Sequence, residues 1–273
     1  MNYLFICMKR SGQHGIVNWF AQQNHHDVLH LNNCIKGWEE RHLSPLKEHM
    51  VVHYKYNGAT HDVKNYFIDH KIDPSASNRL RGEYHAADFG KVKERLYNIE
   101  DLSLSEYTHL QMWNFVEMGE NSRTILILRD PFNFIASCLQ RLKDPPDAGA
   151  TDVGVQLPQR LKVWKEHARQ VLHQSESDQD IYFINFNEWF QSHDYRRKIC
   201  SDLGLVHTDA GVNQVMNFGN GSSFDREKFN GSAQEMSVLT RYKSWEHHPA
   251  FKHLVDDELR SWGKEIFGVK IKK

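Results

Sequence analysis

The chain has few of the features that assign a protein quickly to a class. Its 273 residues include only four cysteines, which lie far apart and form no CxxC pair: Cys7, Cys34, Cys138 and Cys200. This spacing argues against a cysteine-based zinc site and is typical of reduced thiols, so we expect a cytoplasmic protein. The formal net charge is only -1, which gives no reason to expect a nucleic acid as partner.

Long hydrophobic runs are absent as well. No apolar stretch approaches the ~20 residues that a membrane-spanning helix needs. The apolar run from Tyr3 to Met8 is followed, rather than preceded, by the basic residues Lys9 and Arg10, and no small-residue cleavage site comes after it. We therefore expect neither a signal peptide nor a membrane span.

Histidine is abundant, with 18 residues, but it forms no recognisable metal motif. His26 and His30 offer an i, i+4 pair, yet no HExxH sequence is present. His247 and His248 precede Pro249 at a predicted helix end, where capping is the simpler explanation. The sequence therefore predicts no metal site.

What the chain does contain is a regular alternation of β-prone runs and amphipathic segments, without internal repeats. This pattern predicts an α/β protein with a mostly parallel, doubly wound central sheet and helices on both faces, the three-layer α/β/α arrangement. The length allows one large domain or two small ones, and we expect a single domain over residues 1–273. The predicted strands cover residues 3–7, 27–31, 50–56, 95–99, 124–128 and 181–186, and the predicted helices residues 14–20, 104–115, 132–142, 157–172, 195–203, 238–245 and 251–267.

The first strand, turn and helix form the most informative stretch, YLFICMKRSGQHGIVNWF, residues 3–20. The first N–H groups of a helix have no internal partner, and the helix dipole adds positive charge there, so such a turn can bind phosphate. Lys9 and Arg10 would add full charges, and Gly12 would let the backbone approach a ligand. The alternative is a surface turn with two solvated cations.

Two common nucleotide motifs do not fit this turn. The P-loop sequence GxxxxGK[ST] places its lysine after the second glycine, whereas here the cations precede Gly12. The dinucleotide motif GxGxxG fails because Gly12 and Gly15 are the only glycines in the turn.

A second informative element follows the strand at residues 124–128. That strand ends in Arg129-Asp130-Pro131 and leads into a helix that carries Ser137. Arg129 could bind a phosphate with two donors, and Ser137 would face the same ligand from the second helical turn. The alternative is a surface turn formed by Arg129 and Asp130, with the serine buried in the helix.

Both elements resemble the cofactor-binding signatures of the sulfotransferases that use 3′-phosphoadenosine 5′-phosphosulfate (PAPS), whose fold is P-loop nucleotide-hydrolase-like. The turn MKRSGQHG is similar to the 5′-phosphosulfate loop, with Arg10, Ser11 and Gly12 matching and Gln13 and His14 replacing the usual Thr-Thr. The segment ILRDPFNFIAS resembles the second signature, which binds the 3′-phosphate. The resemblance implies a cofactor site that consists of Arg10, Ser11, Gly12, Gln13, His14, Gly15, Arg129 and Ser137.

Three loops add to this interpretation. Residues 218–237 are glycine-rich and resemble the late loop that covers the nucleotide in the family, which implies cofactor contacts from Ser222, Ser223 and Arg241; the alternative is a purely structural loop. Residues 57–87 are polar and aperiodic, and we expect a lid or excursion there. Residues 143–156 are rich in Pro, Gly and Asp and are predicted to be a loop.

The resemblance implies transfer of a sulfuryl group from PAPS to a hydroxyl or amine of a small-molecule or glycan acceptor. Lys9, Arg10 and the loop amides would stabilise the departing phosphate without a metal. A base must take the acceptor's proton, and the candidates, in order of preference, are Glu100 and His53 near predicted strand ends and His14 in the turn. The sequence leaves the acceptor and the oligomeric state open.

Two other functions remain compatible with a phosphate-binding turn. A P-loop-like small-molecule kinase would need a lysine after the second glycine and an aspartate for magnesium, and neither is evident. A catalytically inactive nucleotide-binding relative would keep the phosphate contacts without the chemistry, and the exchange of Thr-Thr for Gln13-His14 is compatible with it.

Overall fold

The computed structural model describes residues 1–32, 46–54, 61–69, 79–81, 94–112, 122–143, 150–176, 180–216 and 221–271. The strands in this part of the chain form one sheet in the order β5-β4-β3-β2-β6-β1-β7-β8. Their bounds are β1 (Asn2–Cys7), β2 (Val28–Asn32), β3 (Leu46–Tyr54), β4 (His61–Asp69), β5 (Arg79–Arg81), β6 (Glu94–Glu100), β7 (Ser122–Leu128) and β8 (Ile181–Asn185).

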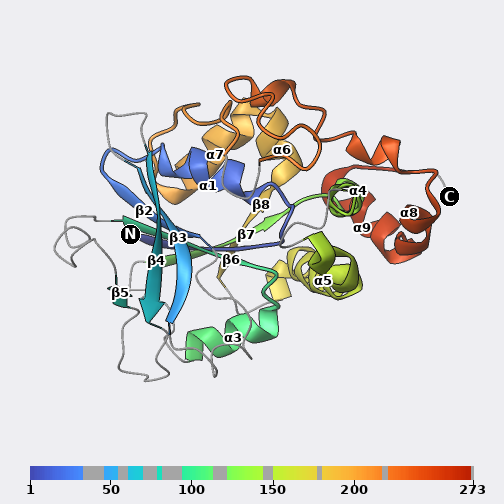
Figure 1. Cartoon of the computed structure of the whole chain (residues 1–273), viewed down its shortest axis with the longest axis horizontal. Coiled ribbons are helices and arrows are strands. Elements are labelled where there is room, and N and C mark those ends of the chain that lie inside the picture. Colours follow the sequence, from blue (N-terminus) through green and yellow to red (C-terminus); the bar gives the residue numbers. More distant parts are fainter. Residues whose placement is uncertain are drawn as a thin grey trace. The chain divides into compact units, whose positions relative to one another are not determined.

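Helices follow β1, β6, β7 and β8 along the chain, whereas β2 to β6 succeed one another as strands in the described residues (Figure 1). None of the helices in the described residues combines the length and the apolar composition needed to cross a bilayer. The α-helices are α1 (Gln13–Ala21), α3 (Leu104–Met112), α4 (Pro131–Arg141), α5 (Ala150–Leu172), α6 (Phe186–Gln191), α7 (His193–Leu203), α8 (Pro249–Leu254) and α9 (Asp257–Phe267), and the 3-10 helices are η2 (Gln174–Glu176), η3 (Ala233–Glu235) and η4 (Arg241–Ser244).

The predicted fold class is confirmed. Strands β2, β6, β1, β7 and β8 form a parallel central sheet, with helices around it. The register of β1 against β6 places Cys7 opposite Glu100, at the carboxyl ends of both strands. Residues 3–7 of β1 and 125–128 of β7 are all buried. A strand buried on both faces needs apolar residues at every position, which is why these two runs could be recognised in the sequence.

The sheet continues beyond β2 with antiparallel strands, which the sequence did not predict. The strand expected at residues 50–56 exists as β3, but it pairs antiparallel with β2, and β4 and β5 extend the sheet in the same manner. Part of the expected excursion at 57–87 is therefore strand, at His61–Asp69 and Arg79–Arg81; the rest lies outside the described residues. Antiparallel strands are held by backbone hydrogen bonds and need no continuous apolar run. The polar residues of β4 and β5 therefore gave no strand signal in the sequence.

The chain divides into two compact units, each built from segments that are not consecutive. The first unit consists of Met1–Cys7, Phe20–Leu126 and Asp180–Tyr182. The second consists of Met8–Trp19, Ile127–Gln179 and Phe183–Lys273. The turn after β1, Arg129 and the late loop all belong to the second unit. The expectation of a single domain remains a prediction.

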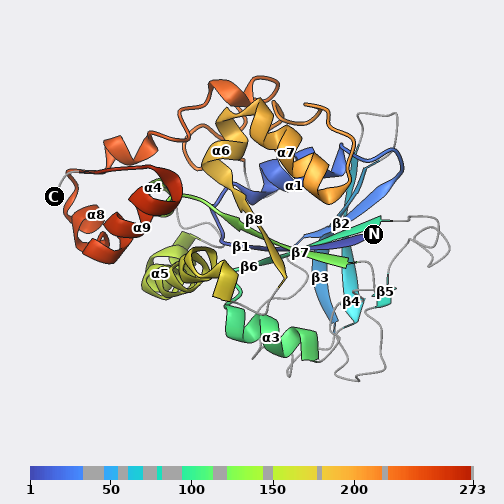
Figure 2. The same cartoon turned by 180° about the vertical axis from the view of Figure 1, so that it is seen from behind.

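Two groups of helices are visible in the second unit. Helices α4, α5, α8 and α9 gather in one group, and α6 and α7 lie beside α1 in both views (Figures 1 and 2). The first group shares an apolar core that includes Phe132, Trp164, Phe251 and Leu259. This burial supplies most of the stability of such helices, since their intrinsic propensity is modest.

Three helix predictions in this unit are wrong in their bounds. Helix α5 begins at Ala150, inside the loop predicted for 143–156, because local propensity is only a weak guide that tertiary context overrides; the helix as a whole packs against α4 and α9. The predicted helix at 251–267 is two helices, since His248 caps α8 and Asp256 caps α9 separately. The predicted helix at 238–245 is only the short 3-10 helix η4.

A buried carboxyl group in the first unit makes its stability depend on pH. The Oε1 atom of Glu94 accepts a hydrogen bond from Asn24 Nδ2 at 2.6 Å. Burial nevertheless raises the pKa of Glu94 from the ordinary value of 4.5 to about 7. Between pH 4.5 and pH 7 the folded chain therefore keeps Glu94 protonated, whereas the unfolded chain has released this proton.

We expect the free energy of unfolding to fall by about 2 kcal/mol between pH 5 and pH 8, because the folded state binds more protons in this range. The substitution Glu94→Gln removes the titrating group and should remove most of this slope. Urea unfolding at both pH values measures it. The exposed Glu227, replaced by glutamine, is the control and should keep the wild-type slope. An unchanged slope in Glu94→Gln would contradict the prediction.

Candidate functional site

The turn between β1 and α1 contains two residues with left-handed backbone. Arg10 has a φ of 70° and Gly12 a φ of 84°. The Ser11 amide donates to the Met8 carbonyl at 3.1 Å, which closes the turn, and the Gly15 amide donates to the Gly12 carbonyl at 3.1 Å. Turns of this kind can direct successive N–H groups toward one anion. The local geometry is therefore suited to a phosphate at the start of α1.

Gly12 is required by its surroundings as well as by its φ angle. A Cβ atom at this position would lie 2.3 Å from Cε2 of Phe186, in α6. At Gly15 the same construction gives 3.4 Å to Cη2 of Trp189, which is an ordinary contact. Helix α6 therefore presses its aromatic residues against the turn, and only a glycine fits at position 12.

The side chains of the turn form a short polar chain. Ser11 and Gln13 are buried, and Ser11 Oγ donates to Gln13 Oε1 at 3.2 Å. Gln13 Nε2 lies 3.5 Å from His14 Nε2. Gln13 thus lies between Ser11 and His14 and contacts both side chains. Four other residues of the turn are half-buried: Lys9, Arg10, His14 and Gly15.

Arg129, at the end of β7, lies against this turn. Its Nη1 donates to the carbonyl oxygen of Arg10 at 3.4 Å, and its Nη2 donates to the carbonyl oxygen of Val238. The guanidinium carbon is 5.0 Å from the centre of the Phe186 ring. Trp164 Nε1 donates to the Arg129 carbonyl at 2.9 Å and fixes its backbone. Two sequence motifs that are 119 residues apart therefore meet in one unit.

The charge of Arg129 is poorly compensated. The residue is only 2% exposed, its Nε has no hydrogen-bond partner, and no carboxylate among the described residues forms an ion pair with it. Burial, and then the charge of Arg241, lower its pKa to about 9. A buried cation without a counterion is costly. An anion bound here would relieve that cost.

Asp130 forms no ion pair with Arg129 and caps α4 instead, although its charge partly opposes the lowering of the Arg129 pKa. Its Oδ1 accepts from the Asn133 amide at 2.9 Å. Asn133 Nδ2 in turn donates to the Leu239 carbonyl at 2.9 Å, and Asn133 Oδ1 accepts from the Tyr242 amide at 3.1 Å. Because Arg129 and Asp130 are both buried, the alternative of a surface turn is wrong. Asn133 links the start of α4 to the segment that follows the late loop.

The late loop reaches Ser137 as well. Ser137 Oγ and Ser223 Oγ are 3.0 Å apart and buried. Arg241 Nη2 lies 2.8 Å from Ser222 Oγ and 2.5 Å from Asp225 Oδ2. Burial lowers the pKa of Arg241, although the Asp225 carboxylate opposes this shift. Arg241 therefore has a counterion that Arg129 lacks, and it holds Ser222 beside the pair of serines. Residues 217–220, which include the first part of this predicted loop, lie outside the described residues.

The three candidate bases fall in different units. Glu100 ends β6 opposite Cys7, the last residue before the turn, and His53 lies in β3 opposite Leu29. Both belong to the first unit, and the side chain of His53 is outside the described part. His14 belongs to the second unit, beside Gln13.

Several residues that shape this site could not be recognised in the sequence. Phe186, Trp164 and Asn133 carry no motif, and their apolar or capping roles look like ordinary packing. Asp225 lies two residues after Ser223 and could have been suspected as a partner of Arg241. The carbonyl groups of Arg10 and Val238 carry no sequence signal at all, because every residue has one.

Comparison with known proteins gives a distant structural likeness only. No protein-family model and no curated protein sequence matches the chain. Among solved structures, the chain is similar to the mouse sulfotransferase SULT7A1 complexed with PAP, with a TM-score of 0.48 and 11% sequence identity. The match covers 97% of this chain and 88% of that one. A likeness this distant assigns neither a family nor an activity.

Proposed function

We propose that the chain is a sulfotransferase that uses PAPS, with the 5′-phosphosulfate at residues 10–15 and the 3′-phosphate at Arg129 and Ser137. The observation that carries this proposal is the position of Arg129, whose Nη1 lies 3.4 Å from the Arg10 carbonyl oxygen. This contact between the two predicted signatures supports the proposal, because one nucleotide would have to reach both of them. Ser222, Ser223 and Arg241 would complete the 3′-phosphate end through the contacts with Ser137.

The electrostatics favour an anion with several charges. Arg129 is buried, lacks a carboxylate partner in the described residues and has an unpaired Nε. A phosphate could accept from Nε and from a terminal nitrogen together, the two-donor geometry that arginine offers. Lys9, Arg10 and the first amides of α1 would supply further positive potential at the other phosphate.

In the reaction, the bond between sulfur and the bridging oxygen of the phosphosulfate breaks, and a new bond forms from sulfur to the acceptor oxygen or nitrogen. Negative charge grows on the departing phosphate, where Lys9, Arg10 and the loop amides would stabilise it. The acceptor's proton passes to a base, for which Glu100 is preferred to His53 and His14. No step requires a metal. The acceptor would be a carbohydrate or a small metabolite.

A thermal-shift measurement tests the proposal. Adenosine 3′,5′-bisphosphate, the product without its sulfuryl group, should stabilise the protein by about 2.7 kcal/mol at a hundred times its dissociation constant. ATP with magnesium should have a much smaller effect, because it lacks a 3′-phosphate for Arg129 and Ser137. Incubation with PAPS and a panel of phenols, sugars and amines should then transfer sulfate to at least one acceptor.

The competing functions give different results. Stabilisation by ATP with magnesium but not by the bisphosphate would indicate a kinase and overturn the proposal. Stabilisation by the bisphosphate without transfer to any acceptor, and without slow hydrolysis of PAPS, would indicate an inactive nucleotide-binding relative. If neither ligand stabilises the protein, Arg129 does not bind the phosphate of a nucleotide and the proposal is overturned.

A further inference from the structure

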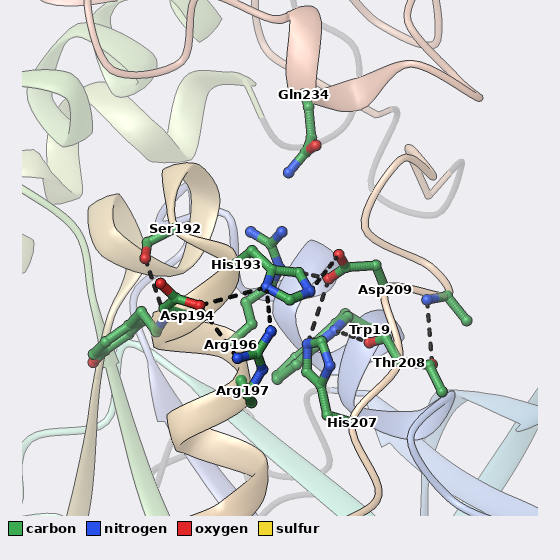
Figure 3. A network of polar contacts seen from close by, with 12 residues as sticks. Trp19, Ser192, His193, Asp194, Arg196, Arg197, His207, Thr208, Asp209 and Gln234 are labelled. Atoms are coloured by element: carbon green, nitrogen blue, oxygen red, sulfur yellow. Dashed lines mark hydrogen bonds and ion pairs between the residues drawn. The ribbon is translucent and has the colours of Figure 1, made fainter.

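A second cluster of polar residues lies where α7 begins and the following loop returns. His193 is the first residue of α7, and His207 and Asp209 follow its carboxyl end. In Figure 3 the two imidazole rings and the carboxylate point toward one another. One ligand atom from each residue lies within 4.8 Å of the other two. None of these residues takes part in the proposed reaction.

The distances are close to those of a metal site. His193 Nε2 lies 3.6 Å from Asp209 Oδ2, and His207 Nε2 lies 3.6 Å from Asp209 Oδ1. Ligands about 2.1 Å from a tetrahedral zinc ion are separated by about 3.4 Å. Two ligand atoms at the widest separation of 4.8 Å would have to approach each other by about 1.4 Å. His193 and Asp209 are 47% and 42% exposed, so rotation of their side chains can supply this movement.

The residues around the cluster are arranged as supports for such a site. Arg196 Nε donates to Asp209 Oδ1 at 2.8 Å, and its Nη1 donates to the Trp189 carbonyl at 2.8 Å. This leaves Asp209 Oδ2 available as a ligand. His207 Nε2 is buried and has no hydrogen-bond partner. A hydrogen bond to the second oxygen, like the one from Arg196 to Asp209 Oδ1, commonly orients a carboxylate that binds a metal.

The other nitrogen of His193 also has a suitable neighbour. Asp194 Oδ1 lies 3.7 Å from His193 Nδ1 and could accept from it when Nε2 binds a metal. Arg197 Nη2 lies 3.3 Å from the same nitrogen and would have to turn away. Its side chain is 62% exposed, so this displacement is inexpensive.

We propose that His193 Nε2, His207 Nε2 and Asp209 Oδ2 bind a zinc ion, with water in the fourth position. Two imidazoles and one carboxylate are a ligand set that suits zinc, and the exposed side of the cluster leaves room for the water. The sequence did not suggest this site, because His207 follows His193 by fourteen positions and no short motif joins them. The expectation of no metal site was based on short sequence motifs, and these three residues form no such motif.

The site would fasten a segment that supports the phosphate-binding turn. Trp19 Nε1 donates to the Thr208 carbonyl at 3.2 Å, between the two ligands His207 and Asp209. Asn18 Nδ2 donates to the Gly211 carbonyl at 3.3 Å. Both donors lie on α1, whose first residues form the proposed 5′-phosphate site. A zinc ion would therefore tie the start of α7 to the loop that holds α1 in position.

The test uses the full chain after treatment with a chelator. Zinc titration followed by calorimetry should show a site with one ion per chain, and Co²⁺ in place of zinc should give the visible absorption of a tetrahedral complex. The substitutions His193→Gln and His207→Gln should each weaken this site by about 100-fold or more, since they remove a ligand outright. His247→Gln, which changes a histidine that is 88% exposed, is the matched control and should bind as the wild type does.

The result that overturns the proposal is a wild-type protein whose number and affinity of zinc sites match those of both ligand variants. Circular dichroism of the metal-free proteins checks that the variants fold, and His193 is exposed enough for its replacement to be tolerated. Adenosine 3′,5′-bisphosphate binding is measured separately, with and without zinc. Loss of zinc binding with retained nucleotide binding, or the reverse, distinguishes a failure of this site from a failure of the proposed function.

Discussion

Replacing Arg129 with glutamine is expected to weaken the binding of adenosine 3′,5′-bisphosphate by about 100-fold or more while leaving the unliganded protein at least as stable as the wild type. Truncating one partner of a buried charged pair costs ~2–5 kcal/mol in binding. Without the nucleotide, however, the guanidinium is a buried cation with an unpaired Nε and no carboxylate partner in the described residues. Glutamine removes that charge and can still donate to one of the two carbonyl groups.

Two measurements are needed, and they should move independently. Urea unfolding of the unliganded proteins gives the stability, and calorimetry gives the dissociation constant of the bisphosphate. A shift of 100-fold corresponds to ~2.7 kcal/mol of binding free energy. Arg196→Gln is a suitable control, because Arg196 is also buried but forms an ion pair with Asp209. It should lose stability and keep its affinity for the bisphosphate.

If Arg129→Gln lost as much stability as Arg196→Gln, and lost binding only in proportion, the residue would be structural. The role of Arg129 would then be to stabilise the fold through its hydrogen bonds to the carbonyl oxygens of Arg10 and Val238. The proposed function would lose the observation on which it rests.

The substitution Gly12→Ala is expected to destabilise the protein by about 3 kcal/mol or more. A left-handed conformation costs an L-residue ~1–2 kcal/mol. Overpacking typically adds ~1–3 kcal/mol, and the new Cβ would lie 2.3 Å from Phe186 Cε2. Phe186 cannot move freely, because its ring packs at 5.8 Å from Trp189 and at 5.0 Å from the Arg129 guanidinium. Thermal and urea unfolding measure the loss.

Gly204 provides the matched control for this prediction. It has a φ of 70°, and a Cβ added there would meet nothing within 4 Å. Gly204→Ala should therefore cost only the conformational part, about 1 kcal/mol. The double variant Gly12→Ala, Phe186→Leu should recover part of the loss by removing the overlap. Equal losses at positions 12 and 204 would show that Phe186 yields easily and would contradict the expected contact.

The sequence predicted the parts of this protein that local chemistry determines. Strands β1 and β7 were recognised because burial on both faces demands an unbroken apolar run. The turn around Gly12 was recognised because its cations, glycine and following helix are adjacent in the chain. The prediction that Arg129 lies near this turn needed a family resemblance, since nothing in residues 10–15 indicates a partner so far along the sequence.

What the sequence could not predict depends on contacts between distant segments. The carbonyl groups that accept hydrogen bonds from Arg129 are backbone atoms, and their positions follow from the path of the turn at Arg10 and of the segment at Val238. Strand β3 was found within a few residues, but its antiparallel direction depends on which neighbour it pairs with. In the proposed zinc site, helix α7 separates His193 from His207 and Asp209 along the chain, so only the fold brings the three residues together.

The interleaving of the two units has a consequence for synthesis on the ribosome. Strand β1 is synthesised well before Asp180–Tyr182, which the first unit also needs. At translation rates of ~5–20 residues per second, these residues emerge on the order of ten seconds or more after the first ones. Strand β7, whose neighbour at the edge of the sheet is β8, therefore lacks that neighbour until these residues emerge. No single cut can release either unit as an autonomous fragment, because each unit is built from non-consecutive segments. The nascent polypeptide should therefore depend on chaperones until most of it has left the exit tunnel.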